Sequence, residues 1–124
     1  MDILYPTDLR SLITITGRLC ISLYMPTHPI AWEQGSIRLK NLLVVSEARL
    51  AASGQRRPEV HKLMRPAEEL LWNRDFWQHQ SEGLAICLSN DFLVKYRLPA
   101  RFEELLIITN SFHIKPLLPL LGMV

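Results

Sequence analysis

The sequence has few residues of the kinds that build metal and redox sites. It contains two cysteines, Cys20 and Cys87, both within apolar runs, and its four histidines form no His-x-x-x-His or His-x-Cys spacing. Free cysteines in apolar runs behave as small hydrophobic residues. We therefore expect two reduced thiols in the core, a disulfide only if their strands are neighbours, and no metal ion or other cofactor.

Glycine-rich loops and nucleophile motifs are also missing. The segments 53–56 (Ser-Gly-Gln-Arg) and 81–84 (Ser-Glu-Gly-Leu) lack the further glycines and the lysine that phosphate loops and nucleophile elbows need. His79 and Glu82 form the best candidate for a general acid and base pair. A histidine at a helix corner more commonly caps a backbone group, so we expect no enzyme.

Long hydrophobic runs and a strong net charge are absent as well. No apolar stretch approaches the ~20 residues that span a bilayer, and the N-terminus has acidic residues where a signal peptide has basic ones. The formal net charge of +2 gives no general attraction to nucleic acid, although it is compatible with a local basic patch. We expect a cytoplasmic protein without membrane contact, and a chain of 124 residues predicts a single domain, 1–124.

The first part of the chain predicts a helix, a strand and an ordered loop. Proline, threonine and aspartate at 6–8 precede apolar residues at helical spacing, and Gly17 ends that segment. Residues 19–25 are apolar at nearly every position, which is typical of a strand covered on both faces. The loop 27–35, which contains Trp32, is the first candidate binding surface.

Two helices are predicted next, one from Ser36 to about Ala52 and one after Pro58. The first has apolar residues on two opposed sides, which indicates a helix between two neighbours. One side comprises Leu39, Leu42, Leu43 and Leu50, and the other comprises Ile37, Val44, Ala48 and Ala51. The second helix has a single apolar side, and Pro66 either kinks it or begins a separate helix.

The last third of the chain predicts three strands and a helix. Strands are expected at 83–88 and 92–98, joined as a hairpin, and at 105–108. Asn110 or Ser111 then caps a final helix that has leucines at helical spacing. The predicted fold is therefore α+β: a four-stranded, mainly antiparallel sheet with about four helices in the order α-β-α-α-β-β-β-α.

Two corners with aromatic and histidine side chains are predicted to be structural. Phe76 and Trp77 are expected to plug the end of the core, and His79 is expected to bond a nearby backbone group. Phe112 and His113 are expected to fix the final helix onto the sheet.

The order of elements and several motifs resemble the N-terminal domain of the archaeo-eukaryotic class-I peptide release factors and of Pelota. The run 19–26 (Leu-Cys-Ile-Ser-Leu-Tyr-Met-Pro) resembles the family's first strand, and 110–121 resembles a segment in which a Phe-His pair precedes a leucine-rich helix. The similarity is closer to the bacterial branch of this superfamily, whose patterns resemble 75–85 (Asp-Phe-Trp-Gln-His-Gln-Ser-Glu-Gly-Leu-Ala) and 96–104, from Tyr-Arg-Leu-Pro to Phe-Glu-Glu.

This resemblance implies a ribosome-associated role in termination, rescue or translation quality control. The family's stop-codon loop, Asn-Ile-Lys-Ser, is replaced here by 53–58, and Arg56 and Arg57 occupy the equivalent tip. The peptide-releasing Gly-Gly-Gln motif belongs to the family's next domain. We therefore expect an N-terminal module of a longer multidomain protein that is not catalytic alone.

The predicted function is contact with the ribosome or another structured RNA. We expect Arg56 and Arg57 to contact phosphate groups, with Lys62 and Arg65 as flanking support. The alternative is a protein-interaction or scaffold module without RNA contact, which would bind other protein domains through the loop 27–35.

Overall fold

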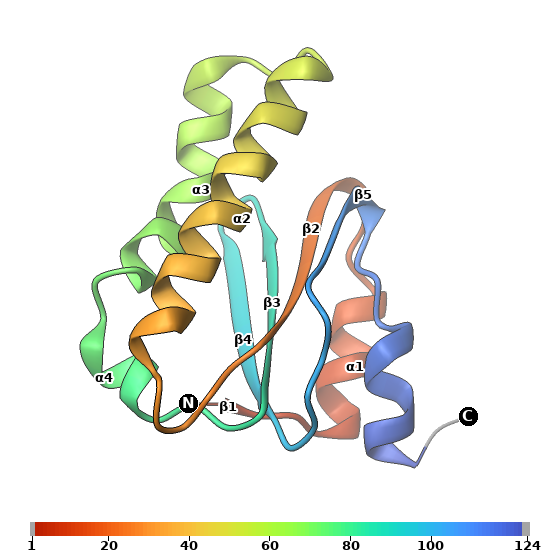
Figure 1. Cartoon of the computed structure of the whole chain (residues 1–124). Coiled ribbons are helices and arrows are strands. Elements are labelled where there is room, and N and C mark those ends of the chain that lie inside the picture. The colour runs from red at the N-terminus through yellow and green to blue at the C-terminus, as the bar shows by residue number, and fades with distance from the viewer. Residues whose placement is uncertain (1, 123–124) are drawn as a thin grey trace.

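A central sheet with helices on both faces forms the protein, and the structure, a computed structural model, describes residues 2–122 (Figure 1). The strands are β1 (Asp2–Ile3), β2 (Thr16–Pro26), β3 (Gly83–Ser89), β4 (Phe92–Leu98) and β5 (Leu105–Ser111). The helices are α1 (Pro6–Ile13), α2 (Glu33–Ala52), α3 (Arg57–Leu70), α4 (Arg74–Gln78) and the 3-10 helix η1 (Lys115–Leu121).

The spatial order of the strands is β1-β4-β3-β2-β5. β1 is parallel to β4, and the other neighbouring strands are antiparallel. The predicted α+β class, the four antiparallel strands and the order of the main elements are confirmed. The two-residue β1 and the five-residue α4 are additions that the sequence pattern did not indicate.

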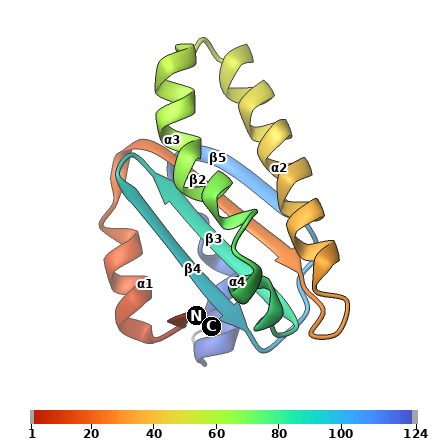
Figure 2. The ribbon, with the colours of Figure 1, turned by 90° about the vertical axis from the view of Figure 1, so that its left-hand side faces the viewer.

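The side chains of β2 alternate between two hydrophobic cores, because successive residues of a strand point to opposite faces of the sheet. Ile21, Leu23 and Met25 belong to the core under α2, α3 and α4. Cys20 and Tyr24 belong to the core under α1 and η1. In Figure 2, α3 and α4 lie in front of the sheet and η1 lies behind it. A strand covered on both faces has no polar side to expose, which explains why residues 19–25 are apolar at every position except Ser22.

Two side chains of β2 bind the chain where it leaves β5. The Tyr24 hydroxyl donates to the carbonyl oxygen of His113, and the His113 backbone N–H donates to Ser22 Oγ at 2.8 Å. Next to them, Phe112 is buried, and its ring centroid lies 5.8 Å from that of Phe92. The segment after β5 is thereby fixed to the centre of the sheet, 89 positions along the chain from Tyr24.

The predicted final helix has the wrong start and the wrong type. β5 continues to Ser111, which pairs with Thr16 at the beginning of β2, so Asn110 and Ser111 are strand residues and not helix caps. The helix begins at Lys115 and has 3-10 geometry. Pro119 inside it has no N–H to donate, which is consistent with a short helix that is not α-helical.

The starts of β2 and α2 were also predicted too late. β2 begins at Thr16, and Gly17 does not end a helix: it lies within the strand at φ +74, where the register with β5 shifts. α2 begins at Glu33, and the Ser36 hydroxyl donates to the Glu33 carbonyl oxygen at 3.2 Å and does not cap the helix. The loop predicted at 27–35 is therefore confined to residues 27–32.

α3 is one continuous helix from Arg57 to Leu70 that includes Pro66, so no separate helix begins at that proline. Its apolar side is buried as expected. The prediction for α2 was wrong on one point. Only one of its two apolar sides is covered, and on the other side Ile37 is 61% exposed and Val44 is 60% exposed.

The beginning of α2 packs closely against Trp77 of α4. The Trp77 side chain is 1% exposed, and its indole N–H donates to the Leu70 carbonyl oxygen at 2.8 Å. A Cβ atom at Gly35 would lie 2.6 and 2.7 Å from two carbon atoms of the indole ring. The glycine at position 35 therefore allows α2 to approach α4.

We expect Gly35→Ala to destabilise the protein although alanine is the better helix former. The helical preference favours alanine by about 1 kcal/mol, whereas overpacking in a closed core costs about 1–3 kcal/mol, and the hydrogen-bonded indole cannot withdraw. We expect the free energy of unfolding, measured by urea denaturation, to fall by about 1 kcal/mol. Gln34→Ala, an exposed neighbour in the same helix, is the control and should not lower stability. An unchanged or raised stability of Gly35→Ala would contradict this packing.

Candidate nucleic-acid interface

α2 and α3 form a helical hairpin whose tip extends beyond the end of the sheet (Figures 1 and 2). α2 ends in a tight reversal, in which the Ser53 N–H donates to Arg49 O at 3.0 Å and the Gln55 N–H donates to Leu50 O at 3.0 Å. Gly54 has φ +89, a conformation that glycine adopts without steric cost. The tip is therefore an ordered connection.

Arg56 and Arg57 are exposed at this tip. Arg56 has extended backbone angles and precedes the first turn of α3, where Pro58 favours helix initiation. Neither arginine forms an ion pair with any residue in the range 2–122. Both guanidinium groups are thus available to an anionic partner.

Lys62 and Arg65 are exposed further along α3. Arg65 Nε lies 3.6 Å from Glu69 Oε1, so its charge is partly offset, whereas Lys62 has no ion-pair partner among the described residues. The structure places all four predicted RNA-binding residues on one hairpin. Positive charge without a counterion is concentrated at the tip and declines along α3.

Two carboxylates approach each other between the hairpin helices. Burial raises the pKa of Glu68 above its ordinary value, and Glu47, within hydrogen-bonding reach, raises it further, while His61 acts in the opposite direction. Neither Glu47 nor Glu68 forms an ion pair with a lysine or arginine in residues 2–122. This side of α2 therefore has unbalanced negative charge.

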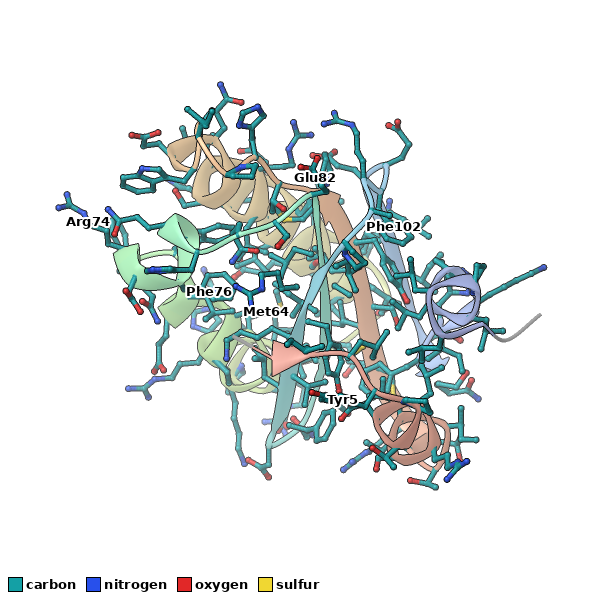
Figure 3. All side chains as sticks on the ribbon, turned by 90° about the horizontal axis from the view of Figure 1, so that it is seen from below. Tyr5, Met64, Arg74, Phe76, Glu82 and Phe102 are labelled. Atoms are coloured by element: carbon teal, nitrogen blue, oxygen red, sulfur yellow. The ribbon has the colours of Figure 1, made fainter. Side chains whose placement is uncertain are left out.

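The aromatic corner at α4 is organised by side chain to backbone bonds. Asn73 Oδ1 accepts from the Phe76 N–H at 3.0 Å and caps α4. Phe76 and Trp77 are both buried, with ring centroids 4.8 Å apart in an edge-to-face arrangement. In Figure 3, Phe76 lies toward the sheet, whereas Arg74 of the same helix lies at the periphery.

His79 at the end of α4 contacts residues of its own helix. Its Nδ1 lies 2.8 Å from the Asp75 carbonyl oxygen and 3.4 Å from Asp75 Oδ1. No hydrogen bond or ion pair between His79 and Glu82 occurs in the described part of the chain. The structure does not join these two side chains into a pair for proton transfer.

The sequence pattern missed two basic residues beside this corner, Lys95 and Arg97 of β4. They line an open hollow of about 520 Å³ together with His79 and Asp75. Arg97 Nη1 donates to the His79 carbonyl oxygen at 3.2 Å, and Lys95 Nζ lies 5.9 Å from the Phe76 ring centroid. In the sequence these two basic residues alternate with residues 94, 96 and 98, which are apolar. This alternation could have indicated that both basic side chains lie on one face of β4. Because α4 lies far from the hairpin tip (Figure 1), this hollow does not extend the tip.

The loop 27–32 is ordered by its own histidine. His28 Nδ1 accepts from the backbone N–H groups of Ile30 and Ala31, both at 3.1 Å. Trp32 is half-buried against the core, and the Arg74 guanidinium lies 5.9 Å from its ring centroid. Ile30, 83% exposed, is therefore the apolar residue that this loop presents to solvent.

Cys20 and Cys87 are buried as free thiols in the core under α1 and η1. Their strands are neighbours, but Cys87 lies opposite Ser22, so the two cysteines are diagonal and not directly opposed. Burial, with a smaller effect from Cys20, raises the pKa of Cys87 to about 12. The reactive thiolate form is strongly disfavoured.

Within residues 2–122, no group of three or more His, Cys, Asp and Glu residues is arranged to bind a metal ion. None of the helices in this range has the length and apolarity needed to cross a membrane. No protein-family model matches the chain, and no curated protein matches it either. The resemblance to release factors therefore rests on the motifs in the sequence.

We expect Glu68→Gln to stabilise the protein at neutral pH. Because the pKa of Glu68 is raised in the folded state, its ionisation disfavours folding as the pH rises above the ordinary value of 4.5. Below that value the carboxyl group is protonated in both states. The gain in melting temperature should therefore be present at pH 7 and disappear near pH 4.

Glu59→Gln is the matched control on the same helix. Glu59 lies in the first turn of α3, beside Leu19 and Asn90, where the helix dipole favours a carboxylate. Its replacement should leave the melting temperature at pH 7 unchanged or slightly lower. A Glu68→Gln gain that persists unchanged at pH 4 would argue against the carboxylate contact as its cause.

Proposed function

We propose that this chain is an RNA-contacting module of a bacterial release-factor-like protein, acting on the ribosome in termination, rescue or translation quality control. The observation that carries the proposal is the tip of the α2–α3 hairpin. There, two adjacent arginines that are free of ion pairs within residues 2–122 lie at the turn of a hairpin that extends past the sheet. A ribosomal role places the protein in the cytoplasm.

The chemistry of the tip suits phosphate and not base recognition. Guanidinium groups form paired hydrogen bonds with phosphate oxygens, and contacts to the backbone of RNA fix position without selecting sequence. Because the tip lies beyond the sheet, it can enter a groove or crevice of folded RNA while the rest of the domain stays outside. Lys62 extends the contact along α3, and Arg65 contributes less because Glu69 lies beside it.

The module binds and positions, and it does not catalyse. The buried thiols are held as neutral groups, and His79 contacts the backbone and carboxylate of Asp75. Any peptide release or rescue reaction would therefore require groups supplied by another domain or by the ribosome.

A protein-interaction module without RNA contact is the second candidate function. The exposed Ile30 in the ordered loop 27–32 favours it, because an apolar side chain on a rigid loop suits insertion into a partner's pocket.

The double substitution Arg56→Ala and Arg57→Ala tests the RNA proposal. Binding to ribosomes and to a structured RNA is measured over a salt series. Each lost phosphate contact lowers the slope of log K against log salt by about 0.7–0.9, so a decrease of about 1.4–1.8 is expected, with a loss of at least about tenfold in affinity at low salt.

The control is Arg10→Ala with Arg101→Ala, which removes the same charge from exposed positions outside the hairpin. This variant should retain the wild-type salt slope. Equal behaviour of both double variants would show that the tip is not the contact. If the wild-type protein binds no RNA at low salt but retains a protein partner that Ile30→Asp abolishes, the protein-interaction function replaces the RNA function.

A further inference from the structure

The outer side of α2 is apolar and uncovered in the single chain. Ile37 is 61% exposed, Val44 60% and Val45 41%, and Ala48 and Ala51 are exposed on the same side. A helix with apolar residues on two opposite sides normally has neighbours on both. The covered side contacts the sheet and α3, so the outer side lacks the second neighbour that its composition indicates.

The outer side also has the spacing of a coiled-coil seam. Its residues alternate in steps of three and four: Gln34, Ile37, Asn41, Val44, Ala48 and Ala51. Residues at this spacing lie on one side of the helix along its whole length, so all of them can face the same partner helix. The matching surface is therefore another helix.

We propose that α2 pairs with α2 of a second copy of this chain, antiparallel across a twofold axis between Asn41 and Val44. The seam has a large side chain, Ile37, near its start and two small ones, Ala48 and Ala51, at its end. In the antiparallel arrangement, Ile37 of one copy packs against Ala48 of the other, and Asn41 packs against Val44. A parallel pair would oppose Ile37 to Ile37 and alanine to alanine, which leaves the alanine end loosely packed.

The charges beside the seam favour the same arrangement. Lys40 and Glu47 flank it on the side of α3, and neither has an ion-pair partner among residues 2–122. Antiparallel pairing places Lys40 of each copy opposite Glu47 of the other, twice by symmetry. This lysine also approaches the region where Glu47 and Glu68 are crowded, and so offsets their repulsion.

On the other flank of the seam, the two arginine side chains already have partners within the same chain. Arg38 Nη1 lies 2.9 Å from Glu104 Oε1, and Arg49 Nη1 donates to the Leu106 carbonyl oxygen at 3.2 Å. Arg49 also protects the outer edge of β5, because the Leu106 carbonyl would otherwise be free to accept from another strand. Association through the helix seam is thus favoured over pairing of strand edges.

Asn41 gives the pair its specificity. A single asparagine within an apolar seam favours the arrangement in which its amide finds a polar partner. In the proposed pair the two Asn41 residues are offset by about 4.5 Å along the helix axes, at 1.5 Å per residue, so each amide can turn toward the other while the side-chain stem packs beside Val44. The arginine tips lie at opposite ends of the pair, so the inference does not depend on RNA binding.

The association is tested by sedimentation equilibrium over a concentration series. The wild-type protein should dimerise, and Val44→Glu, which puts two like charges beside the axis, should raise the dissociation constant more than tenfold. Ile13→Glu, at a 57% exposed position on α1, should leave it unchanged. Circular dichroism of dilute samples checks that each monomer is folded. A wild-type monomer at 1 mM, or a dimer that Val44→Glu does not weaken, would refute the proposal.

Charge reversal and crosslinking test the orientation. Lys40→Glu should weaken the dimer, and adding Glu47→Lys should restore it. Under mild oxidation, a mixture of Lys40→Cys and Glu47→Cys proteins should form the mixed disulfide in preference to either symmetric one. Preferential symmetric crosslinks would instead indicate a parallel pair and overturn the antiparallel arrangement.

Discussion

β2 is bonded along both edges and covered on both faces, and its two neighbouring strands and both hydrophobic cores are arranged around it. β3 pairs with it from Ile21 to Pro26, and β5 pairs with it from Cys20 to Tyr24 and again at Thr16. The alternating side chains of β2 separate the core under α2 and α3 from the core under α1 and η1. The α2–α3 hairpin starts beside the sheet and extends past its end (Figure 1).

Local signals in the sequence were sufficient where an element begins and ends for local reasons. The bounds of β4 were predicted correctly because turn residues precede Phe92 and Pro99 follows Leu98. These local signals failed where the bounds of an element depend on a residue far away in the sequence. Ser111 resembles a helix cap, but its pairing with Thr16 keeps it in β5. α2 begins three residues before Ser36, where Gly35 is fitted against Trp77, a residue of another helix.

The residues of the candidate site also differ in how far local sequence identifies them. Arg56 and Arg57 could be identified because they lie in the connection between two recognisable helices. Lys95 and Arg97 could not be connected with His79, since only the packing of α4 beside β4 brings them together. The second apolar side of α2 was predicted to be covered, and in the single chain it is exposed. The error was to expect its neighbour within the same chain, and the proposed pairing of two copies explains the pattern without that neighbour.

The late arrival of the partners of β2 has a consequence for biosynthesis. The ribosome completes β2 early, but β3 ends at Ser89 and β5 ends at Ser111, so both edges of this central strand remain unpaired until those later strands are made. The bonds from Ser22 and Tyr24 to His113 form later still. Pairing of both edges of β2 therefore waits until β5 has been made, and a nascent chain interrupted before β5 exposes an apolar strand that favours aggregation and chaperone binding.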